Sequence, residues 1–364
     1  MANPKGSRIV VAMSGGVDSS VAAALLEKEG YDTIGVTFRM WPKEECGSSV
    51  GRSCCNLEAV TRARAAAEHL VIPYYVIDLT EEFKQNVIDY FCDAYMKGLT
   101  PNPCVICNKK IKFGLLMSKA LSLGATALAT GHYANVSLDK RSGRYLLKEG
   151  RDKDKDQSYF LFCLSQDQLK RAVFPLGNMT KDAVRRLAKK MNLGTFDTAS
   201  SQDICFTQDV KYAEYIKNKI GADIKPGDIV DKDGKVLGQH KGIPFYTIGQ
   251  RRGLGVAHEE PLYVTGIDTA NNRVTVGRKE EVLKKSLIAD GMNWISINGI
   301  NNPIKVMVKI RYNHEKAKAT VTKIGNDAVN VTFDRPQPAP TPGQAVVFYD
   351  RDVVVGGGWI KEAL

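Results

Sequence analysis

The sequence predicts an α/β fold with three parts: an N-terminal doubly wound parallel sheet, a small central domain and a C-terminal antiparallel β-barrel. Strand-like and helix-like segments alternate over roughly the first 200 residues, which is typical of a parallel sheet with helices on both faces. Beyond residue 205, glycine and proline turns separate short segments, and from residue 262 alternating β-like segments dominate. The predicted domains are 1–206, 207–278 and 279–364.

The N-terminal sheet begins with a buried strand at 8–13, RIVVAM. A helix follows at 19–29, because Val21 and Leu25 share a face at helical spacing and Gly30 ends the pattern. The alternation continues with strands at 33–38, 74–79 and 126–130 and helices at 57–70, 81–97 and 109–122. Ligands of such sheets bind beyond the carboxyl ends of the strands. We therefore expect the functional loops at 14–20, 38–56, 99–108 and 131–132.

The C-terminal part consists mostly of segments in which apolar and polar residues alternate, several of them separated by NN or GN turns. These segments are LYVTGID, RVTVG, KVMVKIRY, ATVTKI, AVNVTF, QAVVFYD and DVVVGGGWI. They predict the strands of the barrel. One earlier stretch, KEGRDKDKDQS at 148–158, has mixed charge and predicts an exposed loop.

Composition narrows the class of protein. The chain has 364 residues, of which 43% are hydrophobic, and no apolar run is long enough for a signal peptide or a membrane span. We therefore expect a cytoplasmic protein without a membrane partner. The formal net charge of +11 favours a polyanionic partner over a neutral one. Eight cysteines in such a compartment argue for metal or redox chemistry rather than structural disulfides.

The segment SGGVDSS, residues 14–20, stands between a strand and a helix and predicts an anion-binding loop. Its glycines allow tight turning, its serines offer hydroxyls, and the helix that follows directs its amides at the loop. The predicted contacts to the anion are Ala12, Met13, Ser14, Gly15, Gly16, Val17, Asp18 and Ser19. No Walker lysine motif occurs in the chain. The alternative is that Asp18 or Ser19 only caps the helix.

SGGVDS resembles the PP-loop of the ATP pyrophosphatases, which have a Rossmann-like sheet. Six further motifs occur in the order of the bacterial tRNA-specific 2-thiouridylase (MnmA/TrmU) family: GLTPNPCVICNKKIKF, ATGHYA, KDQSYFL, SSQDICF, TIGQRRGLG and TPGQAVVFYD. The resemblance covers nearly the whole chain. It implies that ATP, with Mg²⁺ held partly by Asp18, adenylates the C2 oxygen of wobble uridine U34 in tRNAs for lysine, glutamate and glutamine. Sulfur then displaces AMP.

The resemblance implies that Cys107 and Cys205 are the catalytic cysteines, on loops beside the nucleotide. The family's aspartate position holds Cys104 in this chain, which gives three aligned cysteines. Three thiolates suit a 4Fe–4S cluster with one open iron. A persulfide relay from Cys205 to Cys107, with Cys104 as a bystander, is the alternative, and zinc lacks a fourth ligand. Cys92 and Cys163 read as core residues, and the segment 45–59 as a mobile loop or a second metal site.

The resemblance also implies further contacts. Phe38 and Gly131 align with residues at the nucleotide, although Phe38 is equally compatible with a core position. The implied tRNA contacts are Asn102, Pro103, Cys104, His132, Lys155, Asp156, Gln157, Arg311, Tyr312 and Gln344. The target base must leave the anticodon stack, because its C2 atom is otherwise hidden. The partners are the tRNA anticodon stem-loop and a sulfur donor, either sulfide or a carrier fed by a cysteine desulfurase. We expect a monomer or a weak dimer.

Two other functions are compatible with parts of the sequence. One is a PP-loop enzyme that adenylates a small molecule, which the basic charge and the β-rich C-terminal part disfavour. The other is an RNA-binding protein on a degenerate ATPase scaffold, which the intact SGGVDSS segment disfavours. Formation of AMP that depends on tRNA distinguishes the 2-thiouridylase from both.

Overall fold

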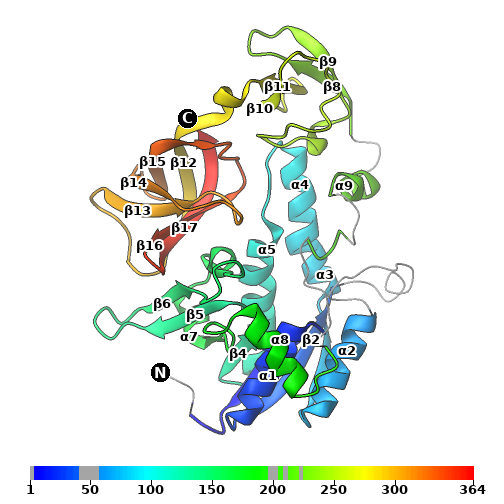
Figure 1. Cartoon of the computed structure of the whole chain (residues 1–364), viewed down its shortest axis with the longest axis vertical. Helices are drawn as coiled ribbons and strands as arrows, with labels where there is room; N and C mark the ends of the chain where they lie inside the picture. Colours follow the sequence, from blue (N-terminus) through cyan, green and yellow to red (C-terminus); the bar gives the residue numbers. More distant parts are fainter. Residues whose placement is uncertain (1–3, 41–56, 196–203, 208–211, 221–223) are drawn as a thin grey trace. The chain divides into compact units, whose positions relative to one another are not determined.

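The computed structural model describes residues 4–40, 57–195, 204–207, 212–220 and 224–364, so Cys46, Cys54 and Cys55 lie outside the described residues. The chain forms two compact units (Figure 1). The first unit contains residues 1–87, 104–209 and 352–354, and the second contains 88–103, 210–351 and 355–364. No helix among the described residues is long and apolar enough to cross a membrane.

The first unit is built on a five-stranded sheet in the order β3-β2-β1-β4-β7, and all its paired neighbours run parallel. Its strands are β1 (Arg8–Ala12), β2 (Asp32–Arg39), β3 (Tyr74–Asp78), β4 (Ala127–Thr130) and β7 (Ala172–Val173). The chain runs outward from β1 through β2 to β3 and returns to place β4 on the other side of β1. The predicted doubly wound parallel sheet is confirmed, with its topological switch between β1 and β4.

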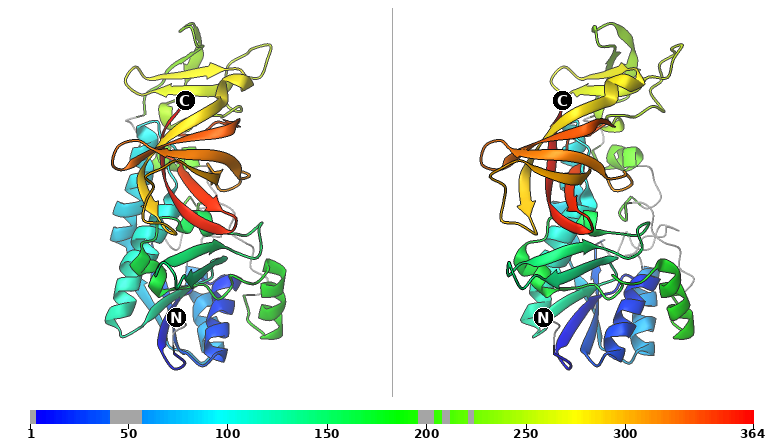
Figure 2. Two further views of the ribbon diagram at one scale, coloured as in Figure 1. Left: turned by 90° about the vertical axis from the view of Figure 1, so that its left-hand side faces the viewer. Right: turned by 60° about the vertical axis from the view of Figure 1, so that its left-hand side comes forward.

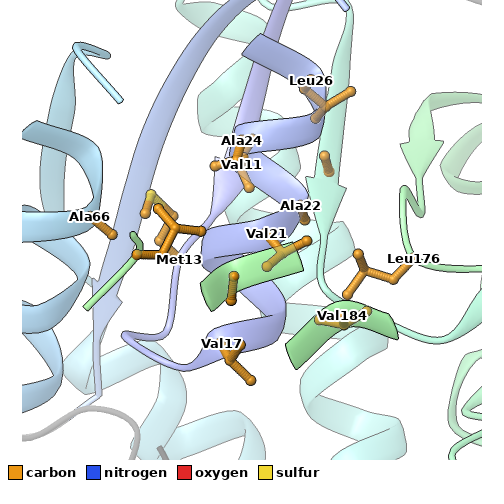
Figure 3. Close-up of a cluster of buried hydrophobic side chains, with 14 of the residues drawn as sticks. Val11, Met13, Val17, Val21, Ala22, Ala24, Leu26, Ala66, Leu176 and Val184 are labelled. Atoms are coloured by element: carbon orange, nitrogen blue, oxygen red, sulfur yellow. The ribbon is translucent and has the colours of Figure 1, made fainter. Parts of the chain in front are cut away.

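Helices α1 (Val17–Lys28) and α2 (Leu57–His69) pack against this sheet, and α8 (Lys181–Lys190) packs against α1. Small residues allow the close approach, because Ala22, Ala23 and Ala24 of α1 are fully buried. Figure 3 shows Val17 and Val21 of α1 beside Leu176 and, from α8, Val184. The start of α8 is thereby held beside the start of α1.

Two long helical stretches change winding along their length. The first consists of α3 (Thr80–Phe83), a π-helical segment η2 (Lys84–Asp89) and α4 (Tyr90–Met96). The second consists of α5 (Pro103–Ile106), a π-helical segment η3 (Cys107–Leu116) and α6 (Met117–Ser122). Cys104 and Cys107 therefore lie on a helix, and the expectation that they lie on a loop is wrong. A π-helical segment closes wider turns than an α-helix and often marks a functional site.

The first unit also contains elements between β4 and α8 that the sequence did not predict. They are the hairpin β5 (Ala134–Leu138) and β6 (Tyr145–Glu149), the 3-10 turn η4 (Ser158–Leu161) and α7 (Gln166–Arg171). Within the predicted exposed loop at 148–158, Asp156 and Ser158 are buried, so the loop is exposed only in part.

The second unit contains a four-stranded sheet in the order β10-β11-β8-β9. It is formed by β8 (Gly227–Val230), β9 (Val236–His240), β10 (Tyr263–Asp268) and β11 (Arg273–Gly277), together with α9 (Tyr212–Ile220), η6 (Ile243–Phe245) and η7 (Lys279–Val282). His240 fixes the end of β9, since its two ring nitrogens bond Asn272 O and Gly242 N at 3.0 Å. This sheet is the small central domain that the sequence predicted.

The second unit ends in an antiparallel barrel, which confirms the prediction. Its strands follow the order β12-β15-β14-β13-β16-β17, and β12 pairs with β17 to close it. They are β12 (Leu283–Trp294), β13 (Ile304–Lys309), β14 (Ala317–Lys323), β15 (Ala328–Pro338), β16 (Ala345–Asp350) and β17 (Val353–Ala363). Figure 2 shows these strands, in yellow to red, from two sides. Alternate residues such as Val329, Val331 and Phe333 fill the interior. The division of the chain at 206 and 278 stays a prediction.

Candidate nucleotide and cysteine site

The SGGVDSS loop lies at the carboxyl end of β1, beside the switch between β1 and β4. Helix α1 begins directly after it, with Gly16 as the N-cap. Asp18 and Ser19 are therefore inside the first turn and neither is the N-cap residue. Ser14 is exposed, whereas Gly15 is buried. Both the position and the start of a twelve-residue helix suit a bound phosphate.

Two features shape this loop. Gly15 has a φ of +71°, and a Cβ there would lie 2.2 Å from the carbonyl oxygen of Ala59, so only glycine fits. Ser19 Oγ accepts from the amide of Ser14 at 3.1 Å and donates to Gly16 O at 3.1 Å. The serine hydroxyl therefore closes the loop from inside. Arg62 Nε also donates to Gly15 O at 3.2 Å.

The carboxylate of Asp18 is held by two donors from distant parts of the chain. Lys181 Nζ lies 2.7 Å from Oδ1 and 2.6 Å from Oδ2, and Tyr133 Oη donates to Oδ1 at 2.7 Å. Lys181 is only 7% exposed. Burial and the charge of Asp18 raise the pKa of Tyr133, so its hydroxyl stays protonated and remains a donor.

The sequence analysis missed Lys181 and Tyr133. Two signals were available: TKDAVRR begins with a threonine cap, and a lysine in the first turn opposes the helix dipole unless an acid compensates it. The structure confirms the cap, because Thr180 Oγ1 accepts from the amide of Ala183 at 3.3 Å. The phosphate loop thus has a lysine beside it, supplied by α8 rather than by its own segment.

Gly131 and His132 follow β4 on the other side of the switch. A Cβ on Gly131 would lie 2.8 Å from the carbonyl carbon of Asp18 and 2.9 Å from the amide of Ser19, so β4 approaches α1 closely here. His132 Nδ1 lies 2.7 Å from Thr130 Oγ1, and its ring forms a cluster with those of Phe113 and Phe174, which also contact each other. Burial, with a smaller effect of Lys112, holds the pKa of His132 well below its usual 6.5. The imidazole is therefore neutral at neutral pH.

The other residues predicted to contact the nucleotide differ in which of their atoms are accessible to a ligand. The side chains of Met13 and Val17 belong to the hydrophobic core (Figure 3), so only their backbones are available to a ligand. Ala12 and Phe38 are half-buried at the ends of β1 and β2. Thr37 Oγ1 donates to Met13 O at 2.6 Å and ties the two strand ends together.

Cys104, Cys107 and Cys205 all belong to the first unit; Cys107 is 8% exposed and the other two are half-buried. Within the described part of the chain, no three histidine, cysteine or acidic side chains are grouped as metal ligands. The three cysteines therefore do not form the ligand set of a cluster in this conformation. Cys92 and Cys163 are buried as expected, and burial raises the pKa of their thiols to about 11 and about 12.

Hydrogen bonds in both directions connect the segment 160–168 to the cysteine-bearing helix. Gln168 Nε2 donates to the carbonyls of Lys109 at 3.2 Å and Phe113 at 2.8 Å, both in the π-helical segment η3. Asn108 Nδ2 donates to Phe160 O at 3.1 Å. The pattern satisfies carbonyls on a helix whose internal bonds have been rearranged.

The predicted tRNA contacts fall in both units. In the first unit Lys155 is exposed, whereas Asp156 is buried and Gln157 Oε1 accepts from the amide of Tyr133 at 3.0 Å. In the second unit Gln344 Nε2 donates to Pro101 O at 3.5 Å, beside the buried Asn102 and Pro103. Arg311 donates to Pro338 O, and Lys309 Nζ lies 5.5 Å from the ring centre of Tyr312.

Three family models match consecutive parts of the chain. They are described as a tRNA methyl transferase HUP domain over residues 7–209, a tRNA methyl transferase PRC-barrel domain over 213–278 and an aminomethyltransferase beta-barrel domain over 284–360. A solved 4-thiouridine synthetase–RNA complex with bound ATP is 17% identical, with a TM-score of 0.36, and covers 59% of this chain and 50% of that chain. That likeness is too distant to add to the assignment.

Full-length relatives are much closer. The tRNA-specific 2-thiouridylase MnmA 2 of Thermoanaerobacter sp. (strain X514) is 50% identical over 98% of this chain and 99% of its own. MnmA 1 of Caldanaerobacter subterraneus subsp. tengcongensis is 52% identical over 98% of both chains, and MnmA of Clostridioides difficile is 46% identical over 98% and 99%. With this identity along its whole length, the chain belongs to the tRNA-specific 2-thiouridylase (MnmA) family.

Proposed function

We propose that this protein is an ATP-dependent tRNA 2-thiouridine synthase of the cytoplasm. It adenylates the C2 oxygen of U34 in tRNAs for lysine, glutamate and glutamine and then replaces that oxygen with sulfur, which releases AMP and pyrophosphate. The observation that carries the proposal is the SGGVDSS loop at the sheet's switch point, in a chain whose relatives of about half identity bear this name.

The arrangement around the loop suits cleavage of ATP between its α- and β-phosphates. The start of α1 and the exposed Ser14 offer donors to pyrophosphate, and Lys181 provides a cation close to the loop. Mg²⁺ would be held here mainly by phosphates and water, with Asp18 as a carboxylate ligand. Bound Mg²⁺ neutralises charge on the leaving pyrophosphate.

The cysteines supply the sulfur chemistry. The nucleophile that a 2-thiolation needs is the outer sulfur of a persulfide on Cys205, or hydrosulfide that Cys107 releases from it by closing a disulfide with Cys205. The raised pKa values of Cys92 and Cys163 keep those thiols inert. We keep a 4Fe–4S cluster on Cys104, Cys107 and Cys205 as the first source of sulfur to test. The persulfide relay is the second. The cluster requires the three thiolates to converge further than in this conformation.

The test of function is thiolation by the purified protein. An unmodified tRNA transcript, ATP, Mg²⁺ and sulfide are incubated without oxygen, and 2-thiouridine and AMP are measured. We expect both products from the wild type and from Cys92→Ala, and neither from Cys107→Ala. Formation of AMP without tRNA indicates a small-molecule substrate, and binding of tRNA without AMP indicates an RNA-binding protein; either result contradicts the proposal.

The test of the cluster is separate. Iron and acid-labile sulfide are measured on protein purified without oxygen, in the wild type and in Cys104→Ala. A cluster predicts about four irons per chain, lost together with thiolation in the variant. Iron-free protein that stays active as Cys104→Ala supports the relay and overturns the cluster, while the thiolation function stands.

A further inference from the structure

The loop at 151–157, between β6 and η4, turns two of its three acidic groups inward and its basic groups outward. Asp156 is 3% exposed and accepts from the amides of Gly150 at 2.9 Å and Ser158 at 3.1 Å. Asp152 Oδ2 accepts from the amide of Lys181 at 2.8 Å. The exposed charged residues of the loop are Arg151, Lys153, Asp154 and Lys155, and Lys153 Nζ also pairs with Glu149 at 2.8 Å. The outer surface is therefore basic and suits a phosphate backbone.

The same loop holds both donors that fix Asp18. At one end, Asp152 caps the first turn of α8 through the amide of Lys181, whose ammonium bonds both oxygens of Asp18. At the other end, Gln157 bonds the amide and the carbonyl of Tyr133, at 3.0 and 2.9 Å, and Tyr133 Oη donates to Asp18. Two short chains of hydrogen bonds thus run from one exposed loop to one residue of the phosphate loop.

We propose that the 151–157 loop couples the binding of RNA to the nucleotide site. RNA phosphates contact Arg151, Lys153 and Lys155 and hold the loop in its docked form, with Asp152 on α8 and Gln157 on Tyr133. The docked loop keeps Lys181 and Tyr133 in place, which orients Asp18 and the start of α1 for ATP. This coupling rests on the proposed function, because it needs both an RNA and a nucleotide substrate.

The coupling is positive and reciprocal. Both ligands favour the docked loop, since RNA meets a basic surface only when the acids are turned inward, and ATP meets an ordered Asp18 only when its two donors are held. A loop ordered by the first ligand need not be ordered again by the second. Thermodynamic linkage then requires that each ligand raise the affinity of the other by the same factor.

The experiment measures that factor directly. The dissociation constant of α,β-methylene-ATP with Mg²⁺ is determined with and without a saturating unmodified tRNA transcript. The reciprocal titration, of tRNA with and without the analogue, is also performed. In the wild type we expect each ligand to raise the affinity of the other by about fivefold or more, which is the lower end of typical coupling factors. In Asp152→Ala we expect a factor near one.

Two variants make the result specific. Asp152→Asn keeps an oxygen for the amide of Lys181 and should restore the coupling. Asp139→Ala removes an aspartate that caps the β5–β6 turn through the amides of Arg141 and Ser142, without reaching Asp18, and should leave the coupling intact. If Asp152→Ala folds poorly, Gln157→Met is measured in its place, because it removes the side-chain bond to the amide of Tyr133 and keeps only the backbone bond to the Tyr133 carbonyl.

The outcomes separate this inference from the function itself. Full coupling in Asp152→Ala, or a factor of one in a wild type that thiolates tRNA, overturns the inference and leaves the function standing. A wild type that binds neither the analogue nor tRNA and makes no 2-thiouridine overturns both. Loss of coupling in Asp139→Ala as well shows a general loss of rigidity and also overturns the role of Asp152.

Discussion

Lys181 Nζ contacts both carboxylate oxygens of Asp18, at 2.7 and 2.6 Å, although 163 residues separate the two in sequence. The lysine side chain is 9% exposed and the aspartate side chain 32% exposed. An ion pair this shielded is difficult to replace by water when one partner is lost. The pair therefore connects the first turn of α1 to the first turn of α8.

The stability of this pair can be measured with a double-mutant cycle. We expect Lys181→Met and Asp18→Asn each to lower the free energy of unfolding by about 2 kcal/mol, because the first leaves Asp18 with Tyr133 but no counter-charge and the second leaves the buried ammonium of Lys181 without one. The double variant should lose less than the sum, with a coupling energy of about 1–3 kcal/mol in urea unfolding followed by circular dichroism. The exposed pair of Arg8 and Asp32, at 44% and 45% exposure, serves as control and should couple by less than about 1 kcal/mol. Equal coupling energies for the two ion pairs would show that shielding does not strengthen the pair of Asp18 and Lys181.

Gly131→Ala tests the close approach of β4 to the phosphate loop. The added methyl group meets backbone atoms of Asp18 and Ser19, which cannot move aside without displacing the loop. We expect a loss of about 1–3 kcal/mol in stability and weaker binding of the ATP analogue. Gly194→Ala is the matched control, since a Cβ there meets nothing within 4 Å. An unchanged affinity in Gly131→Ala would show that the loop tolerates displacement.

His132 predicts a loss of stability in mild acid. Because burial lowers its pKa in the folded state, the unfolded chain takes up a proton first as the pH falls below 6.5. Its contribution is therefore fully present above pH 6.5 and is lost below it, by up to about 1.4 kcal/mol per pH unit. We expect His132→Gln to flatten the fall in melting temperature between about pH 6.5 and pH 5, and the exposed His258→Gln not to. If the melting temperature falls equally steeply with pH in the wild type and in His132→Gln, this prediction is wrong.

Gln168 predicts how the cysteine-bearing helix responds to one changed side chain. Glutamate at this position places a negative charge against the carbonyls of Lys109 and Phe113. We expect Gln168→Glu to lower stability by about 2 kcal/mol and to speed amide exchange across 107–116. The control is Gln337→Leu, whose amide bonds only the nearby Arg335 O, with an expected change below about 0.5 kcal/mol. If amide exchange across 107–116 is unchanged in Gln168→Glu, Gln168 does not stabilise η3.

The parts of the fold that local patterns determine were predictable. RIVVAM and SGGVDSS lie next to each other in sequence and in space, so the strand, the loop and its place in the sheet followed from periodicity and glycine chemistry. Gly131 follows β4 in sequence and packs at the switch, as expected. The barrel strands were predictable for the same reason, since their alternation reports which face is buried.

Contacts between distant segments were not predictable in this way. Nothing near Asp18 in sequence indicates Lys181, because the pair forms only when α8 packs on α1. The sequence predicts a helix over 109–122 and a loop over 99–108, whereas the helix begins at Pro103, a position that proline favours, and so includes Cys104 and Cys107. Gln168, which bonds two carbonyls of the π-helical segment η3, belongs to the separate helix α7.

Because Asp18 and Lys181 are far apart in sequence, this phosphate loop cannot be transferred to another protein as one short segment. A Walker segment carries its lysine within a few residues, so the loop and its cation move together when the segment is copied. Here a transplanted SGGVDSS would arrive without its cation, and a nascent chain has no lysine at this place until α8 has been synthesised and has docked. Any engineered fragment that is to bind nucleotide must therefore extend past α8.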